Sequence, residues 1–287
     1  MNDIDCDLCG SAARSFLKEE NGYPISRCND CSLLYVNRIP AAENGKVIGE
    51  YYSGTEAEIE ANRVRYVDVS KFLLNEIDAL HPVRGRLLDI GCGYGFFLAA
   101  AEQDGWSVSG TDLSEIAVEY VRSRHGIADV HVTDLSGDEL TDERFDVINM
   151  TNVLEHVPSP TEVLGACVRR LEPGGLLVVR VPNMDYSIVQ ERLAKVIEIL
   201  RLGPGYKLSL LATEPPSHLS GFNSRTLRRY FDKVGLETIV IKPSKLSATA
   251  QQSRIYQVFE SMVGLLYKAS FGKVNLAPTV IAVATAK

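Results

Sequence analysis

Four cysteines near the N-terminus are spaced as metal ligands. They form two Cys-x-x-Cys pairs, Cys6 with Cys9 and Cys28 with Cys31, and 18 residues separate the pairs. Each such turn presents two thiolates, and two turns together complete a tetrahedral Zn²⁺ site. Four thiolates leave no open position for a reacting water, so the pattern predicts a structural zinc that folds the segment and takes no part in catalysis.

Disulfides and a redox pair are the alternatives for these cysteines. A reducing cytoplasm disfavours disulfides, and no βαβ pattern surrounds either pair to support a redox motif. Of the other two cysteines, Cys167 lies on a helical apolar pattern and is expected in the core.

A glycine-rich turn forms the second group of candidate residues. The sequence Asp89-Ile90-Gly91-Cys92-Gly93-Tyr94-Gly95 follows an apolar strand directly. Glycines let the backbone pass close to a ligand, and the N-terminus of the next helix offers free N–H groups to an anion. The dinucleotide motif Gly-x-Gly-x-x-Gly requires glycine at position 96, where this chain has Phe96, so the turn departs from that motif by one residue.

Two aspartates follow the next strands and are candidates for holding a nucleoside. Asp112 lies about 20 residues beyond the glycines at the end of a strand, where a carboxylate can accept both ribose hydroxyls. The alternative for Asp112 is a carboxylate at a helix N-terminus. Asp134 follows the third strand, where it either accepts from an adenine amino group or serves as an ordinary turn residue.

Two histidines are candidate catalytic bases, because imidazole titrates near neutral pH. His156 follows the fourth strand of the predicted sheet, and the alternative is that it anchors its loop together with Glu155 through hydrogen bonds. His218 lies after two prolines, on a segment expected to cover the site, and the alternative is a surface histidine without a role.

An α/β arrangement is needed to position these residues. From Arg86 onward, short apolar strands alternate with helices, which predicts a parallel sheet with helices on both faces. The strands are expected at 87–90, 106–111, 130–132, 145–150, 176–181, 237–242 and 279–285. Helices are expected at 96–103, from Ser114 to near Gly126, and at 160–172, 187–201, 225–234 and 255–268.

The expected organisation is a zinc-binding module over 1–40, a linker and helix over 41–80, and a main domain over 81–287. The linker itself is expected at 41–62 and a loop at 206–220. Ser187 and Gln190 predict the cap of the helix at 187–201. Within the helical lid or insertion at 185–220, that helix has an apolar face for a lid, a dimer contact, a lipid-linked acceptor or packing on its own domain.

Composition excludes several classes of function. The 287 residues carry 30 Lys and Arg against 37 Asp and Glu, and the net charge of −7 argues against a broadly basic nucleic-acid surface. No apolar run reaches the roughly 18 residues that a membrane span needs. The N-terminus lacks the apolar core of a signal peptide, so we expect a soluble, cytoplasmic protein of undetermined oligomeric state.

Together, these motifs resemble those of class I S-adenosylmethionine-dependent methyltransferases. The resemblance covers most of the chain and includes the glycine turn, Asp112 and Asp134, followed by Phe145–Ile148, Leu154–Val157 and Leu171–Gly175. More narrowly, the chain is similar to bacterial methyltransferases that have an N-terminal four-cysteine module and a late His-x-x-x-Phe-x-x-x-x-Leu segment, here His218 to Leu227.

The resemblance implies a Rossmann-like, seven-stranded sheet with an antiparallel last strand, and it implies a role for each matching residue. Gly91 and Gly93 lie under the methionine moiety, Asp112 binds the ribose, and Thr151 lies beside the cofactor. Asp134 and Leu135 lie at the adenine. The full set of residues expected to bind S-adenosylmethionine is Asp89, Gly91, Gly93, Gly95, Asp112, Leu113, Asp134, Leu135 and Thr151.

One related group differs at a defined position. The quinone-precursor O-methyltransferases carry Glu-x-x-Glu-His and bind a divalent cation there, whereas this chain has Asn152-Val153-Leu154-Glu155-His156. Replacement of a carboxylate by an amide weakens a site for a hard cation, so the metal role is not transferred.

The expected function is methyl transfer to a small-molecule acceptor, with a sugar, a glycolipid or a secondary metabolite as the implied classes. One alternative is an RNA methyltransferase that uses the zinc module to bind its substrate, although the acidic balance disfavours it. Another is a cofactor-binding homologue without turnover, which the intact glycine turn and Asp112 disfavour.

Overall fold

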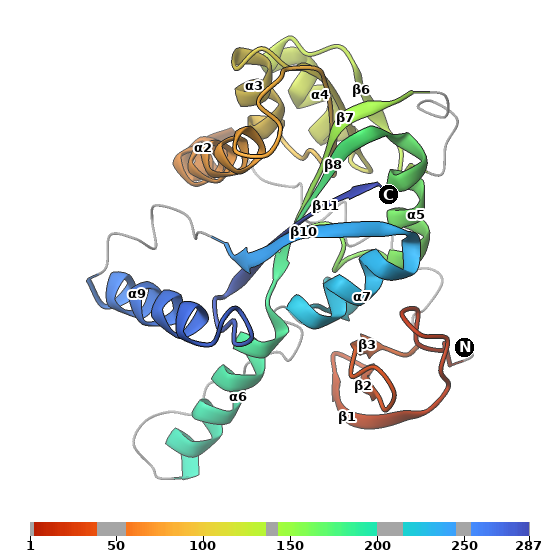
Figure 1. Cartoon of the computed structure of the whole chain (residues 1–287), viewed down its shortest axis with the longest axis vertical. Coiled ribbons are helices and arrows are strands. Elements are labelled where there is room, and N and C mark those ends of the chain that lie inside the picture. The colour runs from red at the N-terminus through yellow and green to blue at the C-terminus, as the bar shows by residue number, and fades with distance from the viewer. Residues whose placement is uncertain (1–2, 39–55, 136–142, 200–214, 245–253, 287) are drawn as a thin grey trace.

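The computed structural model describes residues 3–38, 56–135, 143–199, 215–244 and 254–286. These residues form a seven-stranded sheet and a separate four-stranded sheet (Figure 1). Helices cover both faces of the larger sheet, which confirms the expected α/β class. The smaller sheet contains the N-terminal segment and lies below α7 (Ser224–Val234) in the view of Figure 1.

The large sheet has the strand order β10-β11-β8-β7-β4-β5-β6. Its strands are β4 (Arg86–Ile90), β5 (Ser107–Asp112), β6 (Val130–Val132), β7 (Phe145–Thr151), β8 (Leu171–Pro182), β10 (Leu236–Pro243) and β11 (Thr279–Ala286). The strands β4 to β8 pair in parallel, whereas β11 pairs antiparallel with both β8 and β10. The expected antiparallel last strand is therefore confirmed.

The remaining helices follow the predicted alternation. They are α2 (Glu56–Asp78), α3 (Phe96–Gln103), α4 (Glu115–Tyr120), a π-helical turn η1 (Val121–His125), α5 (Pro160–Arg170), α6 (Met184–Ile199) and α9 (Arg254–Ala269). The helices α2, α3 and α4 lie on one side of the sheet, and α5 and α7 lie on the other (Figure 1). Ser114 caps α4 as expected, since its side chain accepts from the Ala117 N–H.

Successive side chains along each strand point to opposite faces of the sheet, so each face has its own hydrophobic core. Leu87 and Val147 belong to the core on the side of α2 and α3, whereas their neighbours Leu88 and Ile148 belong to the core on the side of α5 and α7. All four side chains are fully buried. A strand buried on both faces is the expected result of helices packing on both sides of a parallel sheet.

The four-stranded sheet joins the N-terminal segment to a distant part of the chain. Its strands are β1 (Arg14–Glu20), β2 (Tyr23–Cys28), β3 (Leu34–Val36) and β9 (Ser220–Gly221), in the order β1-β2-β3-β9. Because β9 comes from the segment before α7, the N-terminal sheet is completed by residues outside the predicted module.

Three local predictions differ from the structure. Ser187 is not a cap but lies inside α6, which begins at Met184. Ser187 is buried, and its hydroxyl donates to the carbonyl of Asn183, the residue that directly precedes the helix. Helix α2 begins at Glu56, inside the expected linker, and β9 lies at the end of the expected loop. Residues 41–55 of the expected linker and 206–214 of the expected loop lie outside the described residues.

No helix within the described parts of the chain combines the length and the apolar character that crossing a membrane requires.

Candidate functional site

The predicted site residues gather where the strand order of the large sheet reverses. The strand β4 has β5 on one side and β7 on the other. The strands that follow β4 are thus added first on one side of it and then on the other. In open α/β sheets, ligands bind outside the carboxyl ends of the strands at such a switch point. The glycine turn follows β4 there. At the same edge β7 ends with Thr151, and the segment that follows it carries His156.

The glycine turn adopts a conformation that requires glycine. Gly91, Gly93 and Gly95 have φ values of 67°, 53° and 71°, in the left-handed region. A side chain at Gly91 would collide with Cγ2 of Val153, and one at Gly95 would approach Cγ2 of Val121 to 2.7 Å. The turn is therefore held by both its backbone conformation and its close neighbours.

Asp112 is bound to the glycine turn. Its side chain is 4% exposed, and its Oδ2 accepts a 2.9 Å hydrogen bond from the Gly93 N–H. Its Oδ1 accepts from the Ser114 N–H, also at 2.9 Å. The carboxylate thus points toward the turn that precedes α3 and away from solvent. The carboxylate thus lies near the start of α4, as the alternative expected, and beside the glycines; its binding of a ribose stays a prediction.

A second buried carboxylate lies at the end of β4. Oδ1 of Asp89 accepts a 2.6 Å hydrogen bond from Nδ2 of Asn149 on β7. Burial raises the pKa of Asp89 to about 7, the Asn149 hydrogen bond opposes the rise, and the negative charge of Asp112 adds to it. Thr151 extends this hydrogen-bond network, since its hydroxyl donates to Oδ1 of Asn149 at 3.3 Å. These contacts link the ends of β4 and β7.

Three other residues expected to bind the cofactor, of which Asp134 and Leu135 are expected at the adenine, differ in exposure. Leu113 is 49% exposed, and Asp134 is exposed as well. Leu135 has a φ of 71° and is buried in the core on the side of α5 and α7. The role of Leu113 at the cofactor, and those of Asp134 and Leu135 at the adenine, stay predictions.

The two candidate bases lie next to each other although 61 residues separate them. The His156 and His218 rings meet edge to face with their centroids 4.8 Å apart. Nδ1 of His156 makes a hydrogen bond to the Ser217 carbonyl, a contact in which Nδ1 carries the proton because a carbonyl oxygen only accepts. Burial lowers the pKa of His156, while hydrogen bonds to the Ser217 and Asn152 carbonyls oppose the change.

Glu155 completes this group. Glu155 is buried, with 2% of its side chain exposed, and its Oε1 lies 3.9 Å from Nε2 of His156. One carboxylate oxygen of Glu155 and one ring nitrogen each of His156 and His218 lie within 4.8 Å of one another. Burial raises the pKa of Glu155 to about 8, and the positive charge of Arg180 opposes the rise. The arrangement places a mostly neutral imidazole beside a carboxyl that resists ionisation.

The four cysteines converge as the spacing predicts. Sγ of Cys6 lies 3.4 Å from Sγ of Cys31, Sγ of Cys9 lies 3.5 Å from Sγ of Cys28, and all four sulfurs lie within 4.8 Å of one another. A tetrahedron with Zn–S bonds of about 2.3 Å places its sulfurs about 3.8 Å apart. The cluster therefore fits Zn²⁺ in both ligand number and spacing.

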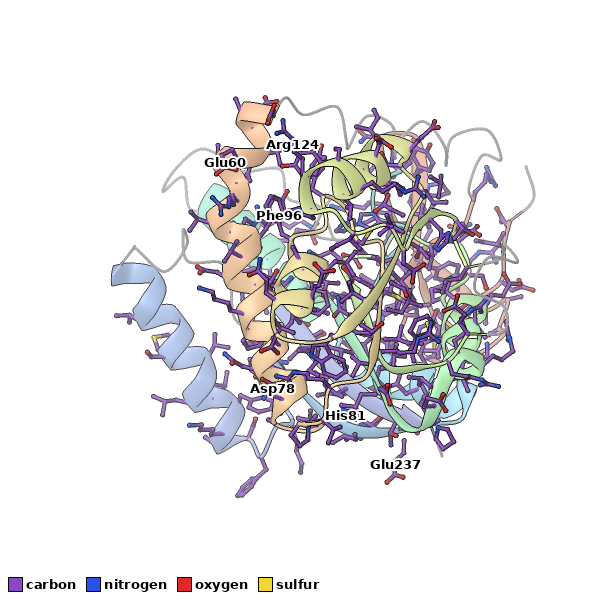
Figure 2. The ribbon with its side chains drawn as sticks, turned by 90° about the horizontal axis from the view of Figure 1, so that it is seen from above. Glu60, Asp78, His81, Phe96, Arg124 and Glu237 are labelled. Carbon is purple, nitrogen blue, oxygen red and sulfur yellow. The ribbon has the colours of Figure 1, made fainter. Side chains whose placement is uncertain are left out.

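Aromatic side chains surround the helix that follows the glycine turn. Tyr66 of α2 stacks on Phe96 with ring centroids 5.2 Å apart, and Tyr94 meets Tyr120 edge to face at 5.1 Å. Figure 2 shows Phe96 beside α2 and Arg124 near the N-terminal end of that helix, where Arg124 pairs with Glu56. The helix α2 thus covers the start of α3.

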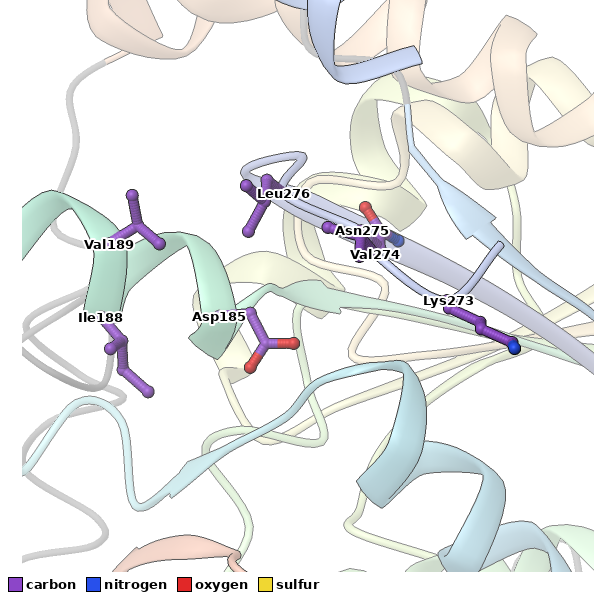
Figure 3. A pocket seen from close by; sticks show the side chains of 7 residues that line it. All are labelled: Asp185, Ile188, Val189, Lys273, Val274, Asn275 and Leu276. Atoms are coloured by element: carbon purple, nitrogen blue, oxygen red, sulfur yellow. The ribbon is translucent and has the colours of Figure 1, made fainter. Parts of the chain in front are cut away.

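A cavity of about 280 Å³ lies apart from the predicted residues (Figure 3). It is lined by the first turns of α6 and by the segment before β11, with Asp185 and Lys273 as its charged residues. None of the residues expected to bind the cofactor lines it. The cavity therefore adds no support to the predicted binding set.

Two buried polar residues beside the site, Asn149 and Arg180, were not predicted from the sequence. Asn149 holds Asp89, and Arg180 is 5% exposed inside β8, where it donates to Ser244 and Asn152. The signal for Arg180 is present in the sequence, since it interrupts the apolar run Leu176–Val181. No local pattern marks Asn149, because its partner lies 60 residues away.

Comparison with known families identifies the chain as similar to methyltransferases. A family model described as a methyltransferase domain matches residues 61–240 of the chain. The chain is 35% identical over 114 residues to the ubiquinone biosynthesis O-methyltransferase of Pseudomonas entomophila, a match that covers 38% of this chain and 49% of that protein. The protein of the same name from Pseudomonas fluorescens is 27% identical over 219 residues, which cover 74% of this chain and 82% of that protein. The chain thus spans about half the length of the first relative.

Solved structures share the fold at low identity. A structure titled as a putative S-adenosylmethionine-dependent methyltransferase from Listeria monocytogenes superposes with a TM-score of 0.54 at 13% identity, covering 76% of this chain and 98% of that one. A methyltransferase from Thermotoga maritima, titled as a possible histamine N-methyltransferase, gives a TM-score of 0.52 at 19% identity, covering 85% and 98%. At these identities the likeness concerns the fold alone.

Proposed function

The chain belongs to the methyltransferase domain family, and from that premise we propose that it transfers a methyl group from S-adenosylmethionine to a small-molecule acceptor. The observation that carries the proposal is the 2.9 Å hydrogen bond between the Gly93 N–H and the buried Asp112 carboxylate at the switch point of the sheet. This contact joins the two features that such a cofactor needs, a backbone it can approach closely and a carboxylate for its ribose.

In the proposed mechanism the protein positions the reactants. When bound, S-adenosylmethionine supplies a methyl group on a sulfonium, with a neutral thioether as the leaving group. The turn at 91–95 and Asp112 hold the cofactor, and Thr151 lies beside it. The protein then needs to align the acceptor atom with the methyl carbon and exclude water.

His156 and His218 are the proposed bases for an acceptor that loses a proton. Similarity to ubiquinone biosynthesis O-methyltransferases supports an oxygen nucleophile. Its hydroxyl proton would pass to an imidazole nitrogen as the oxygen–carbon bond forms and the sulfur–carbon bond breaks. Burial lowers the pKa of His156, which favours the neutral imidazole that a base requires at neutral pH. Sugars, glycolipids and secondary metabolites remain the proposed acceptor classes.

We further propose that Cys6, Cys9, Cys28 and Cys31 hold a structural zinc. The spacing of the four sulfurs supports a closed tetrahedral site, in which the metal folds the N-terminal segment and takes no part in methyl transfer. Cysteines in this form require a reducing compartment, so we place the protein in the cytoplasm.

Calorimetric titration with S-adenosylmethionine and S-adenosylhomocysteine tests the proposal. The wild-type protein is expected to bind both, and Asp112→Ala to bind them about 10- to 100-fold more weakly, because hydrogen bonds from the ribose to a charged acceptor are lost. Asp129→Ala is the control. Asp129 directly precedes β6, so it lies at the amino ends of the parallel strands, whereas Asp112 lies at their carboxyl ends. Failure of the wild-type protein to bind either ligand refutes the proposed function.

A further inference from the structure

The N-terminal module and the sheet domain share one hydrophobic core. Leu8 and Leu33 of the module lie in the same buried cluster as Leu154, Phe222 and Tyr230 of the sheet domain. Leu154 is fully buried and directly precedes Glu155 and His156. The module thus packs against the segment that carries one of the candidate bases, and its position is fixed by apolar contact as well as by hydrogen bonds.

Asp7, between the first two cysteines, bonds directly to the segment that follows His156. Its Oδ1 accepts a 2.9 Å hydrogen bond from the Ser159 hydroxyl. Its Oδ2 accepts from the Thr161 N–H at 2.9 Å and from the Thr161 hydroxyl at 2.7 Å. Ser159 is also the N-cap of α5, so the carboxylate lies at the positive end of that helix, where a negative charge is stabilised. Lys233 of α7 donates to the Asp7 carbonyl from the other side.

A second set of contacts joins the module to the segment that carries His218. The Val36 N–H donates to the Leu219 carbonyl at 2.8 Å, and β3 pairs with β9 through Tyr35 and Ser220. On the other side of His218, the Pro215 carbonyl accepts a 3.0 Å hydrogen bond from Nδ2 of Asn21. His218 is therefore bracketed by two contacts with the module.

The two segments also bind each other between these contacts. The Glu155 carbonyl accepts from the Leu219 N–H at 2.8 Å, and His156 bonds to the Ser217 carbonyl. The relative position of the two imidazole rings is thus set by two chain segments, and the N-terminal module holds both of them.

We propose that the cysteine module is a positioning element for the His156–His218 pair, and that Asp7 is the residue through which it holds the His156 segment. This inference rests on the proposed function, in which the two histidines serve as bases. It gives the module a role beyond its own folding: zinc fixes the turn Cys6–Cys9, that turn fixes Asp7, and Asp7 fixes the start of α5 and the segment before it.

The chain offers a matched control for Asp7. Asp30 also lies inside a Cys-x-x-Cys turn, between Cys28 and Cys31, but its side chain is exposed. Asp7→Ala and Asp30→Ala therefore make the same chemical change in equivalent turns. Thr161→Val removes the hydroxyl that bonds to Asp7 without touching the module, so it tests the contact if Asp7→Ala fails to fold.

The experiment compares the imidazole resonances of the five histidines in the full-length, zinc-loaded protein labelled at histidine. Asp7→Ala and Thr161→Val are expected to shift the signals of His156 and His218 and to leave those of His81, His125 and His131 in place. The amides of residues 155–157, 159 and 161 should exchange at least about tenfold faster in both variants, because hydrogen bonds at the start of α5 are lost. Asp30→Ala should match the wild type in both measurements.

Zinc content and S-adenosylhomocysteine affinity serve as independent readouts. Both are expected to stay within about twofold of the wild type in Asp7→Ala and Thr161→Val, because neither residue is a metal ligand or part of the proposed cofactor site. Unchanged His156 and His218 resonances in both variants, or the same shifts in Asp30→Ala, overturn the inference. Absence of S-adenosylhomocysteine binding in the wild type would instead overturn the proposed function, while the resonance comparison would still decide the role of Asp7.

Discussion

At the residue scale, Glu155 is the buried carboxyl with the most distinctive surroundings. Neither of its carboxylate oxygens has a hydrogen-bond partner on another of the described residues. Burial raises its pKa from about 4.5 to about 8, while Arg180 acts in the opposite direction. Between these two pH values Glu155 therefore holds a proton in the folded protein that it loses in the unfolded chain, and ionisation of Glu155 opposes folding.

This proton uptake predicts a pH-dependent effect of Glu155→Gln. Between pH 4.5 and 8, wild-type stability contains a term that falls as pH rises, because the folded state favours the protonated carboxyl. Glutamine does not titrate and lacks this term. The free energy of unfolding of Glu155→Gln relative to wild type is thus expected to increase by at least about 1 kcal/mol from pH 5 to pH 8.

Urea unfolding of both proteins at pH 5, 6.5 and 8 measures this difference. The raised pKa of Asp89 gives both proteins a similar slope, so it cancels in the comparison. Glu237→Gln is the control, since Glu237 is exposed on β10 and its difference from wild type should not change with pH. A constant difference between Glu155→Gln and wild type would contradict the assigned protonation of Glu155.

At the scale of elements, the glycine turn after β4 is fitted to the segment after β7. Gly91 has a φ of 67°, and a Cβ there would overlap Cγ2 of Val153. Gly126 has a similar φ of 72°, but a Cβ at that position meets nothing within 4 Å. These two glycines separate the cost of the backbone conformation from the cost of the collision.

Alanine at the two positions is therefore expected to have unequal effects. Gly126→Ala should lower the free energy of unfolding by about 1–2 kcal/mol, the cost of a left-handed alanine. Gly91→Ala should lower it further, because Val153 has to move. The double variant Gly91→Ala/Val153→Ala should lose less stability than the sum of its single changes, as chemical denaturation can measure. Equal losses for Gly91→Ala and Gly126→Ala would show that the contact with Val153 is unimportant.

At the scale of the whole molecule, the cysteine cluster joins the smaller sheet to the larger one. Cys6, Cys28 and Cys31 are each 1% exposed and belong to the same buried cluster as residues of α5 and α7. Loss of a metal at this position should therefore loosen more than the N-terminal residues, because β9 and the start of α5 depend on the module for hydrogen bonds.

Zinc analysis with hydrogen exchange tests this expectation. The wild-type protein and Cys92→Ser should each contain one zinc per chain, because Cys92 lies outside the cluster. Cys28→Ser should lose the zinc, because Cys28 is one of the four proposed ligands. Removal of the metal by a chelator should increase exchange in β1–β3 and β9 and leave β4, β5 and β7 protected. Retention of zinc by Cys28→Ser, or equal exchange in all strands after chelation, would contradict the proposed role of the metal.

Local patterns in the sequence determined the elements and the residue types of the site. Apolar strands alternating with helices predicted the sheet, and the glycines followed by Asp112 predicted one edge of it, because strand periodicity and backbone conformation are properties of neighbouring residues. The same locality explains the wrong cap at Ser187. A serine followed three residues later by glutamine has the same pattern inside a helix as at its start, and here the helix begins earlier, at Met184.

Tertiary structure alone decided which distant residues meet. Asn149 reaches Asp89, His156 meets His218, and Asp7 bonds to Ser159 and Thr161 across 152 and 154 residues of chain. The pairing of β9 with β3 was equally invisible, because a strand of two residues has no periodicity of its own. Such contacts arise from the packing of whole elements against one another, and a single sequence records each partner without recording that they are partners.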